Sequence, residues 1–192
     1  MLDFFDSLDR IVFLFVNRSL ANPVTDYIMP LVTSDDNLRV LYALAMILLL
    51  IKGDTRLRWL VVFSALALLI TDQVSAGLLK PIFARLRPCH TIGQVHLLVN
   101  CGGGYAMPST HAANTVAQAV LFGTCVKQAR LYLYAFAALI ALSRIFVGVH
   151  YPLDVIVGAA IGVIIGFIAL LGFRKFEARV LRQSNSAPFG AR

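Results

Sequence analysis

The chain has 192 residues, of which 59% are hydrophobic and 14% are charged, and its formal net charge is +7 at neutral pH. Soluble domains carry about 25% charged residues, so this composition excludes an ordinary soluble domain and indicates a membrane protein. Apolar stretches fill most of the length, and no linker or internal repeat divides it. We therefore expect one membrane-embedded domain over residues 1–192.

The N-terminal segment is predicted to form an amphipathic helix. Apolar residues recur at helical spacing from Leu2 to Val16, with acidic and basic residues between them. A helix of this kind lies in the bilayer interface or crosses it partway. The pair Asn22-Pro23 breaks it, and the short apolar piece at 24–33 could complete a broken crossing.

Five further stretches are long and apolar enough to cross a bilayer once their flanks are added. They are residues 38–51, 59–79, 112–126, 131–149 and 153–173. The sequence thus predicts an all-α, polytopic membrane helix bundle with five to six transmembrane helices and an amphipathic N-terminal helix.

Basic residues occupy alternate loops, at 52–58, at 127–130 and in the tail at 174–192. Lysine and arginine are enriched on the cytoplasmic side of membrane proteins, which predicts a basic cytoplasmic tail and a cytoplasmic C-terminus. The segment 80–111 and the turn around His150 then share the outer face. These inner-face residues account for most of the positive charge, which indicates an anionic membrane rather than nucleic acid.

The first outer-face cluster is K-P-I-F-A-R-L-R-P at 80–88. Lys80 and Arg87 are seven residues apart and share one helix face if the helix continues past Pro81. A lysine charge and an arginine fork together suit a phosphoryl group. The alternative is that these side chains only reach toward lipid headgroups, and we assign that anchoring role to Arg85.

The second cluster, Pro108 to His111, precedes a long apolar helix. A helix start presents free N–H groups to an anion, and the hydroxyl of Ser109 adds a donor. Ordinary helix capping would explain Ser109 but not His111. A histidine titrates near neutrality, so His111 is suited to give a proton to a leaving oxygen.

The third cluster covers residues 143–154. Pro152 is predicted to be the first residue of the last helix, which places Asp154 in its first turn, where it can accept the N–H of His150. The other imidazole nitrogen is then free to attack phosphorus. Arg144 could reach the same oxygens. The alternative is a surface His150 capped by Asp154, with Arg144 paired to Asp72.

At these residues the chain resembles the type-2 phosphatidic acid phosphatase superfamily of integral membrane lipid phosphatases, whose core is related to vanadium haloperoxidases. The family pattern is K, six residues, R-P; then P-S-x-H; then S-R, five residues, H, three residues, D. Residues 80–154 match it with every spacing kept. One departure is Thr110, which stands where the commonest form has glycine.

The resemblance implies a site in which His150 is the nucleophile that forms a phosphohistidine. Asp154 would be its partner, and His111 would be the acid that protonates the leaving group. The phosphate oxygens would be held by Lys80, Arg87, Ser109, Thr110 and Arg144. The resemblance also implies that neither a metal nor another cofactor is needed, and the sequence contains no cluster with zinc-ligand spacing.

We expect metal-independent hydrolysis of a lipid phosphate or diphosphate at the outer face of the bacterial plasma (inner) membrane, facing the periplasm or exterior. By analogy with the family, undecaprenyl diphosphate is the first candidate substrate. Phosphatidylglycerophosphate, lipid A and a lipid phosphotransferase reaction are the alternatives. A peroxidase and a non-catalytic transporter or scaffold are less favoured. Besides the bilayer and its lipid substrate, no nucleic acid and no obligatory protein partner is expected.

Two cysteines lie twelve residues apart in the predicted outer loop, at Cys89 and Cys101. An outer-face location is oxidising, which favours a disulfide over two free thiols. Cys125 is predicted to lie on the inner side and to stay reduced.

Overall fold

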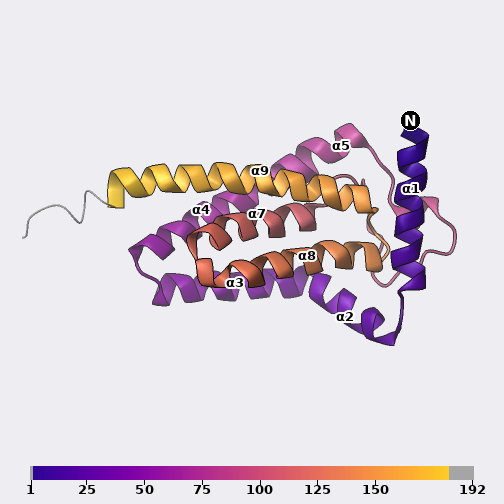
Figure 1. The fold of residues 1–192 in the computed structure, drawn as a ribbon, viewed down its shortest axis with the longest axis horizontal. Coiled ribbons are helices and arrows are strands. Elements are labelled where there is room, and N and C mark those ends of the chain that lie inside the picture. The colour runs from indigo at the N-terminus through magenta and orange to yellow at the C-terminus, as the bar shows by residue number, and fades with distance from the viewer. Residues whose placement is uncertain (1, 182–192) are drawn as a thin grey trace, which may run out of the picture.

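The structure, a computed structural model, describes residues 2–181, which are largely helical and include no β-strand (Figure 1). The predicted all-α class is confirmed. Part of the predicted cytoplasmic tail, 182–192, lies outside the described residues. The helices are α1 (Leu2–Leu14), α2 (Pro23–Thr33), α3 (Asp35–Lys52), α4 (Thr55–Asp72), α5 (Lys80–Phe83), α6 (Pro88–Thr91), α7 (Thr110–Cys125), α8 (Arg130–Phe146) and α9 (Pro152–Phe176). Shorter helical turns are η1 (Phe15–Ser19), η2 (Gln73–Leu79), η3 (Lys127–Ala129) and η4 (Glu177–Leu181).

The long helices form a bundle whose centre is α7. Figure 1 shows α3, α4, α7, α8 and α9 running along the long axis of the molecule, and α1 crossing one end of them. Helix α7 packs against α9, α8 and α4. The starts of α7 and α9 and the end of α8 therefore meet at the end that α1 covers.

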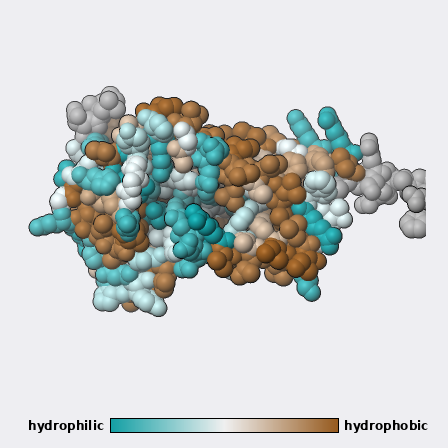
Figure 2. Space-filling view, turned by 180° about the vertical axis from the view of Figure 1, so that it is seen from behind, coloured by the Kyte–Doolittle hydropathy of each residue, from teal (hydrophilic) through white to brown (hydrophobic). Residues whose placement is uncertain are grey.

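Among residues 2–181, three helical stretches are long and apolar enough to cross a membrane: Thr55–Thr91, Lys127–Phe146 and Pro152–Val180. They include three of the five predicted crossings. Helix α7 has only 16 residues, and α3 begins with two aspartates. Figure 2 shows broad apolar patches on the flank of the bundle and polar side chains toward the end that α1 crosses.

Three glycines bring α9 unusually close to α7. Gly158, Gly162 and Gly166 follow one another at four-residue spacing, so they lie on one face of the helix. A Cβ added to them would lie 2.3 Å from the Ser109 carbonyl oxygen, 2.4 Å from that of Ala113 and 2.7 Å from that of Ala117, in that order. Such small residues let two helix backbones touch.

The predicted helix does not continue past Pro81 for more than one turn. Helix α5 ends at Phe83, and Ala84 turns the chain with a left-handed φ of 46°. Lys80 therefore belongs to α5, whereas Arg87 immediately precedes α6. The prediction that one helix face carries both cations is wrong, because the turn at Ala84 separates them.

Replacing Ala84 by glycine should stabilise the protein by about 0.5 to 1 kcal/mol. A left-handed backbone costs a residue with a Cβ about 1 to 2 kcal/mol, and the extra chain entropy of glycine takes back about half of that gain. Ala84 is exposed, so no packing is lost. Thermal unfolding in detergent measures the effect. Ala65→Gly, on the exposed face of α4, is the control and should destabilise by about 1 kcal/mol.

Candidate active site

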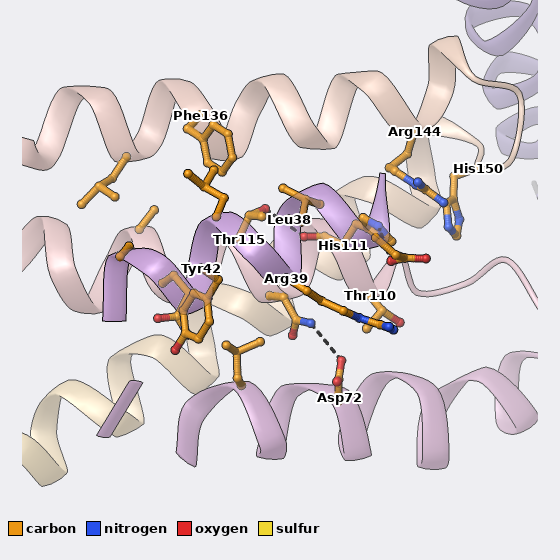
Figure 3. A pocket seen from close by; sticks show the side chains of 18 of the residues that line it. Leu38, Arg39, Tyr42, Asp72, Thr110, His111, Thr115, Phe136, Arg144 and His150 are labelled. Carbon is orange, nitrogen blue, oxygen red and sulfur yellow. Dashed lines mark hydrogen bonds and ion pairs between the residues drawn. The ribbon is translucent and has the colours of Figure 1, made fainter. Parts of the chain in front are cut away.

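A cavity of about 680 Å³ opens between α3, α4, α7 and α8 (Figure 3). Its polar end is lined by side chains from all three sequence clusters: Lys80, Arg87, Thr110, His111, Arg144 and His150. Ser109 and Asp154 do not line the cavity, and both are fully buried beside it. The structure thus brings the predicted residues together around one space.

Buried polar atoms without a hydrogen-bond partner are concentrated at this polar end. Within the described residues they include Nε of Arg87, Oγ of Ser109, Oγ1 of Thr110, Nε2 of His111, Nε of Arg144 and Nδ1 of His150. Buried polar atoms in folded proteins are nearly always hydrogen-bonded. A cluster dominated by unpaired donors, with several cations among them, is suited to bind an anion.

Ser109 does not serve as an ordinary helix cap. It occupies the position before α7, but its side chain makes no capping hydrogen bond. Its backbone N–H donates to the carbonyl oxygen of Asp154 at 2.9 Å, which fixes the start of α7 against α9. Thr110, the first residue of α7 and in ordinary helical conformation, lines the cavity, and the hydroxyls of Ser109 and Thr110 are both unpaired.

His150 lies in the connection between α8 and α9 and is 2% exposed. Its Nδ1 lies 3.6 Å from Oδ2 of Asp154, an ion-pair distance that is too long for a hydrogen bond. The predicted hydrogen bond between them is absent, and Oδ2 of Asp154 accepts the Tyr151 N–H at 2.8 Å. Helix α9 does begin at Pro152, as predicted.

The environment of His150 favours its neutral form. Burial lowers the pKa of the imidazole well below its ordinary value, and the nearby cations Arg144, Arg87 and Lys80 lower it further. Because Nδ1 faces Asp154, the opposite nitrogen, Nε2, is the one available for attack. A neutral imidazole at neutral pH can act as a nucleophile.

Arg144 does not pair with Asp72, the alternative considered from the sequence. Its Nη1 donates to Oγ1 of Thr33 at 2.7 Å, and Asp72 accepts a hydrogen bond from Asn114 at 2.8 Å (Figure 3). The pairing of Arg144 with Asp72 is therefore wrong. Held by Thr33, Arg144 keeps its Nε free at the cavity.

Arg85 is not a plain lipid anchor, because its side chain is only 19% exposed. Its Nη1 lies 2.9 Å from Oδ1 of Asp154, and its Nη2 lies 2.7 Å from Oδ2 of Asp9. The guanidinium also lies over the ring of Tyr151, 4.3 Å from its centroid. The assignment of Arg85 to the lipid headgroups is wrong, since these contacts hold it inside the protein.

The loop between α6 and α7 borders the cavity. Cys89 and Cys101 are joined by a disulfide with their Cα atoms 6.2 Å apart, and Cys125 is free. Cys101 and its neighbours Asn100 and Gly102 line the cavity. The disulfide therefore ties the cavity-lining part of the loop to α6.

Sequence reasoning missed several polar residues of the cavity, among them Asp35, Arg39 and Asn114. Oδ1 of Asp35 lies 3.1 Å from Nε2 of His111 without the alignment of a hydrogen bond. Asp35 and Arg39 are one helical turn apart at the start of an apolar stretch, a position where ionisable residues are functional candidates. That spacing is the signal that could have found them.

Away from the polar end, the lining of the same cavity is mostly apolar. This part is lined by Leu38, Leu41, Ala45, Met46, Leu68, Ala119, Phe122, Leu133 and Phe136. The cavity thus joins an anion-binding end to a hydrocarbon-lined end. This shape matches an amphiphile with a phosphorylated headgroup.

Comparison with known proteins agrees with this arrangement. The family model described as the PAP2 superfamily matches residues 56–178. The chain is 32% identical over 189 residues to a lipid A 4'-phosphatase of Bacteroides thetaiotaomicron, covering 94% of this chain and 83% of the relative. It is 33% identical over 125 residues to an undecaprenyl-diphosphatase of Sulfolobus acidocaldarius, covering 65% of this chain and 59% of the relative.

Two crystal structures share the fold. LpxE of Aquifex aeolicus superposes with a TM-score of 0.71 at 29% identity, over 85% of this chain and 95% of that one. The transmembrane PAP2-type phosphatidylglycerolphosphate phosphatase of Bacillus subtilis superposes with a TM-score of 0.69 at 19% identity, over 92% of this chain and 89% of that one. At the lower identity the likeness concerns the fold alone.

Proposed function

The chain belongs to the PAP2 superfamily and is a phosphatase of membrane lipid phosphates, and we propose that it works without a metal through a phosphohistidine on His150. The observation that carries this proposal is the cluster of unpaired buried donors at the polar end of the cavity. The donors match the oxygens of a phosphoryl group, and the apolar continuation matches a lipid chain.

The cations and the start of α7 hold the phosphate. Arg87 and Arg144 donate from planar guanidinium groups, and Lys80 adds a third positive charge. Ser109, just before α7, and Thr110, its first residue, donate their hydroxyls. Fixed donors of this kind stabilise the negative charge that spreads over the phosphoryl oxygens as the bond to the leaving oxygen breaks.

Two histidines divide the chemistry into two steps. Nε2 of His150 attacks phosphorus, the bond from phosphorus to the leaving oxygen breaks, and His111 gives that oxygen its proton. In the second step His111 takes a proton from water, whose oxygen attacks the phosphohistidine and releases inorganic phosphate. Asp154, 3.6 Å from Nδ1, stabilises the positive charge that His150 carries in between.

The acid limb of the pH profile should lie below the ordinary histidine pKa of about 6.5. The reaction needs neutral His150, and burial lowers the pKa of this imidazole, so the neutral form persists to lower pH. We expect the fall of log kcat/KM on the acid side of the profile to begin only below about pH 6.5. The substrate phosphate also ionises in this pH range, so its own pKa is measured by phosphorus NMR and its contribution is removed from the profile. A corrected midpoint at or above 6.5 would contradict the assignment.

For the substrate we propose a phosphate group of lipid A. Two relatives that match over most of the chain are lipid A 4'-phosphatases, from Bacteroides thetaiotaomicron and, at 30% identity over 83% of this chain, from Porphyromonas gingivalis. Undecaprenyl diphosphate is the second candidate. Arg39 supports it, because it lines the cavity as a cation beyond those of the sequence signature and could bind a second phosphate.

We also propose that α3, α4, α7, α8 and α9 cross the bacterial plasma membrane with the site at the outer face. The turn from α3 to α4, the connection from α7 to α8 and the end of α9 share the opposite end of the bundle (Figure 1). These segments carry the basic residues that mark the cytoplasmic side. A cytoplasmic C-terminus and an α1 lying in the interface follow from this orientation.

The test is phosphate release by the purified protein in detergent with a chelator present. Lipid A, undecaprenyl diphosphate, phosphatidylglycerophosphate and phosphatidic acid are compared by kcat/KM, and lipid A should rank first. Preference for undecaprenyl diphosphate would select the second candidate. Activity that depends on an added divalent metal would overturn the metal-independent mechanism. Phosphate release that needs an added lipid or sugar acceptor would identify a phosphotransferase.

A further inference from the structure

A chain of three charged side chains connects α1 to the nucleophile. It runs from Asp9 in α1 through Arg85 to Asp154, which lies beside His150. Neither Asp9 nor any other residue of α1 falls within the family match at 56–178 or within the sequence signature. The contacts therefore add an element to the site that the family pattern does not contain.

Asp9 is buried although α1 is otherwise largely exposed, and its residue exposure is only 4%. Its Oδ1 accepts the backbone N–H of Leu153, in the first turn of α9, at 2.8 Å. Its Oδ2 accepts from Nη2 of Arg85 at 2.7 Å. A buried carboxylate is costly unless it is paired, so both oxygens are used to hold neighbouring groups.

Arg85 joins the two aspartates with the two arms of one guanidinium group. Nη2 binds Asp9 and Nη1 binds Oδ1 of Asp154 at 2.9 Å, while the ring of Tyr151 supports the planar face. A planar fork with fixed donors determines the direction of the carboxylates that it binds. With Oδ1 held by Arg85 and Oδ2 by the Tyr151 N–H, the carboxylate of Asp154 has one orientation toward His150.

The same N-terminal region also holds the other end of the connection that carries His150. Nδ2 of Asn17, in η1, donates to the carbonyl oxygen of Phe146 at 2.9 Å. Asn17 is fully buried. The N-terminal helical segment thus contacts the chain just before His150 through Asn17 and just after it through Asp9 and Leu153.

We propose that α1 is a positioning element of the active site, in which Asp9 holds Arg85 and Arg85 holds the carboxylate of Asp154 beside His150. The inference rests on the proposed function, because it gives these residues their effect through the nucleophile. Arg85 and Asp9 do not touch the cavity, so they act on the rate of the chemical step and not on substrate binding.

The test compares Asp9→Asn with Asp6→Asn. Asparagine keeps the size of the side chain and can still accept from Leu153, but it removes the charge that holds Arg85. Asp6 is the matched control: it is in the same helix and lies 3.0 Å from the same Nη2, but its side chain is 75% exposed. Exposed ion pairs of this kind contribute little.

We expect Asp9→Asn to lower kcat on lipid A by about tenfold or more, the loss typical of residues that orient catalytic groups, with KM within about twofold. Asp6→Asn should keep both constants within about twofold. Single-turnover formation of the phosphoenzyme should slow by the same factor as kcat. A purely structural role would change thermal stability and leave the kcat of the folded fraction unchanged.

Chemical rescue provides a second measurement that does not depend on the stability of Asp9→Asn. Arg85→Ala should lose activity, and guanidinium ion at millimolar concentration should restore part of its kcat without changing KM. Failure of rescue, an unchanged kcat in Asp9→Asn, or an equal loss in Asp6→Asn would overturn the inference. Wild-type turnover without metal tests the proposed function separately, so the two failures are distinguishable.

Discussion

Replacing His150 by alanine is expected to abolish phosphate release, with a loss in kcat of about 10⁴-fold or more. The imidazole is the only group with which the proposed mechanism forms its covalent intermediate. Without it the cations and the start of α7 still bind the phosphate, so KM should change little. The residual rate would be that of water attacking a bound and polarised phosphate.

The measurement is rapid-quench kinetics with a lipid labelled in the phosphate. Wild-type protein should show a labelled phosphohistidine on the chain, and His150→Ala should show none. The matched control is His90→Ala, which removes an exposed imidazole from α6 and should retain full activity. Turnover retained by His150→Ala would remove the nucleophile assignment, whereas a loss in His90→Ala would indicate a general effect of losing an imidazole near the site.

Gly158→Ala, which adds a single methyl group to α9, is expected to displace the start of α7 and so to lower the activity strongly. The new Cβ would lie 2.3 Å from the carbonyl oxygen of Ser109, and a backbone atom cannot rotate out of its way. The start of α7 must then move away from α9, which breaks the 2.9 Å hydrogen bond from Ser109 to Asp154. A displacement of about 1 Å typically costs a hundredfold in rate, and overpacking costs about 1 to 3 kcal/mol in stability.

Gly172→Ala is the matched control in the same helix. Its Cβ would meet the side-chain atom Cε1 of Phe63 at 3.2 Å, and an aromatic ring can shift by a few tenths of an ångström. We expect nearly normal activity and unfolding temperature for Gly172→Ala, against about a hundredfold lower kcat/KM for Gly158→Ala. Equal behaviour of the two variants would show that the contact between α7 and α9 does not set the geometry of the site.

Local patterns pointed to residues most of which the fold places around one cavity, because the family signature is local in sequence. The spacing of Pro152 and Asp154 gave the start of α9 correctly, since the fixed φ of proline suits the first turn of a helix. The turn at Ala84 was missed because alanine ordinarily continues a helix, and nothing at that position signals a left-handed backbone.

Partners that lie far apart in the sequence could not be predicted from one sequence. Arg85 resembles any basic residue at a membrane helix end until Asp9 and Asp154 are brought beside it by the fold. The same holds for Arg144, whose hydrogen bond to Thr33 joins residues 111 positions apart. The number of membrane crossings was also difficult to predict from the sequence. Helix α7 is short and α3 begins with two aspartates, so whether each crosses depends on the helices that pack around it.

Helices α7 and α3 differ in how tightly the fold constrains them, and they serve different parts of the site. Helix α7 is fixed against α9 through touching backbones, and together they carry His111 and Asp154, with Ser109 directly before α7. Helix α3 has no buried residue and packs against α2 and α4. Yet α3 supplies much of the cavity wall, from Asp35 at the polar end to Met46 at the apolar end. Substitutions in α3 can therefore retune the choice of lipid while the hydrolytic step is preserved, which offers a physical route by which one scaffold acquires different substrates.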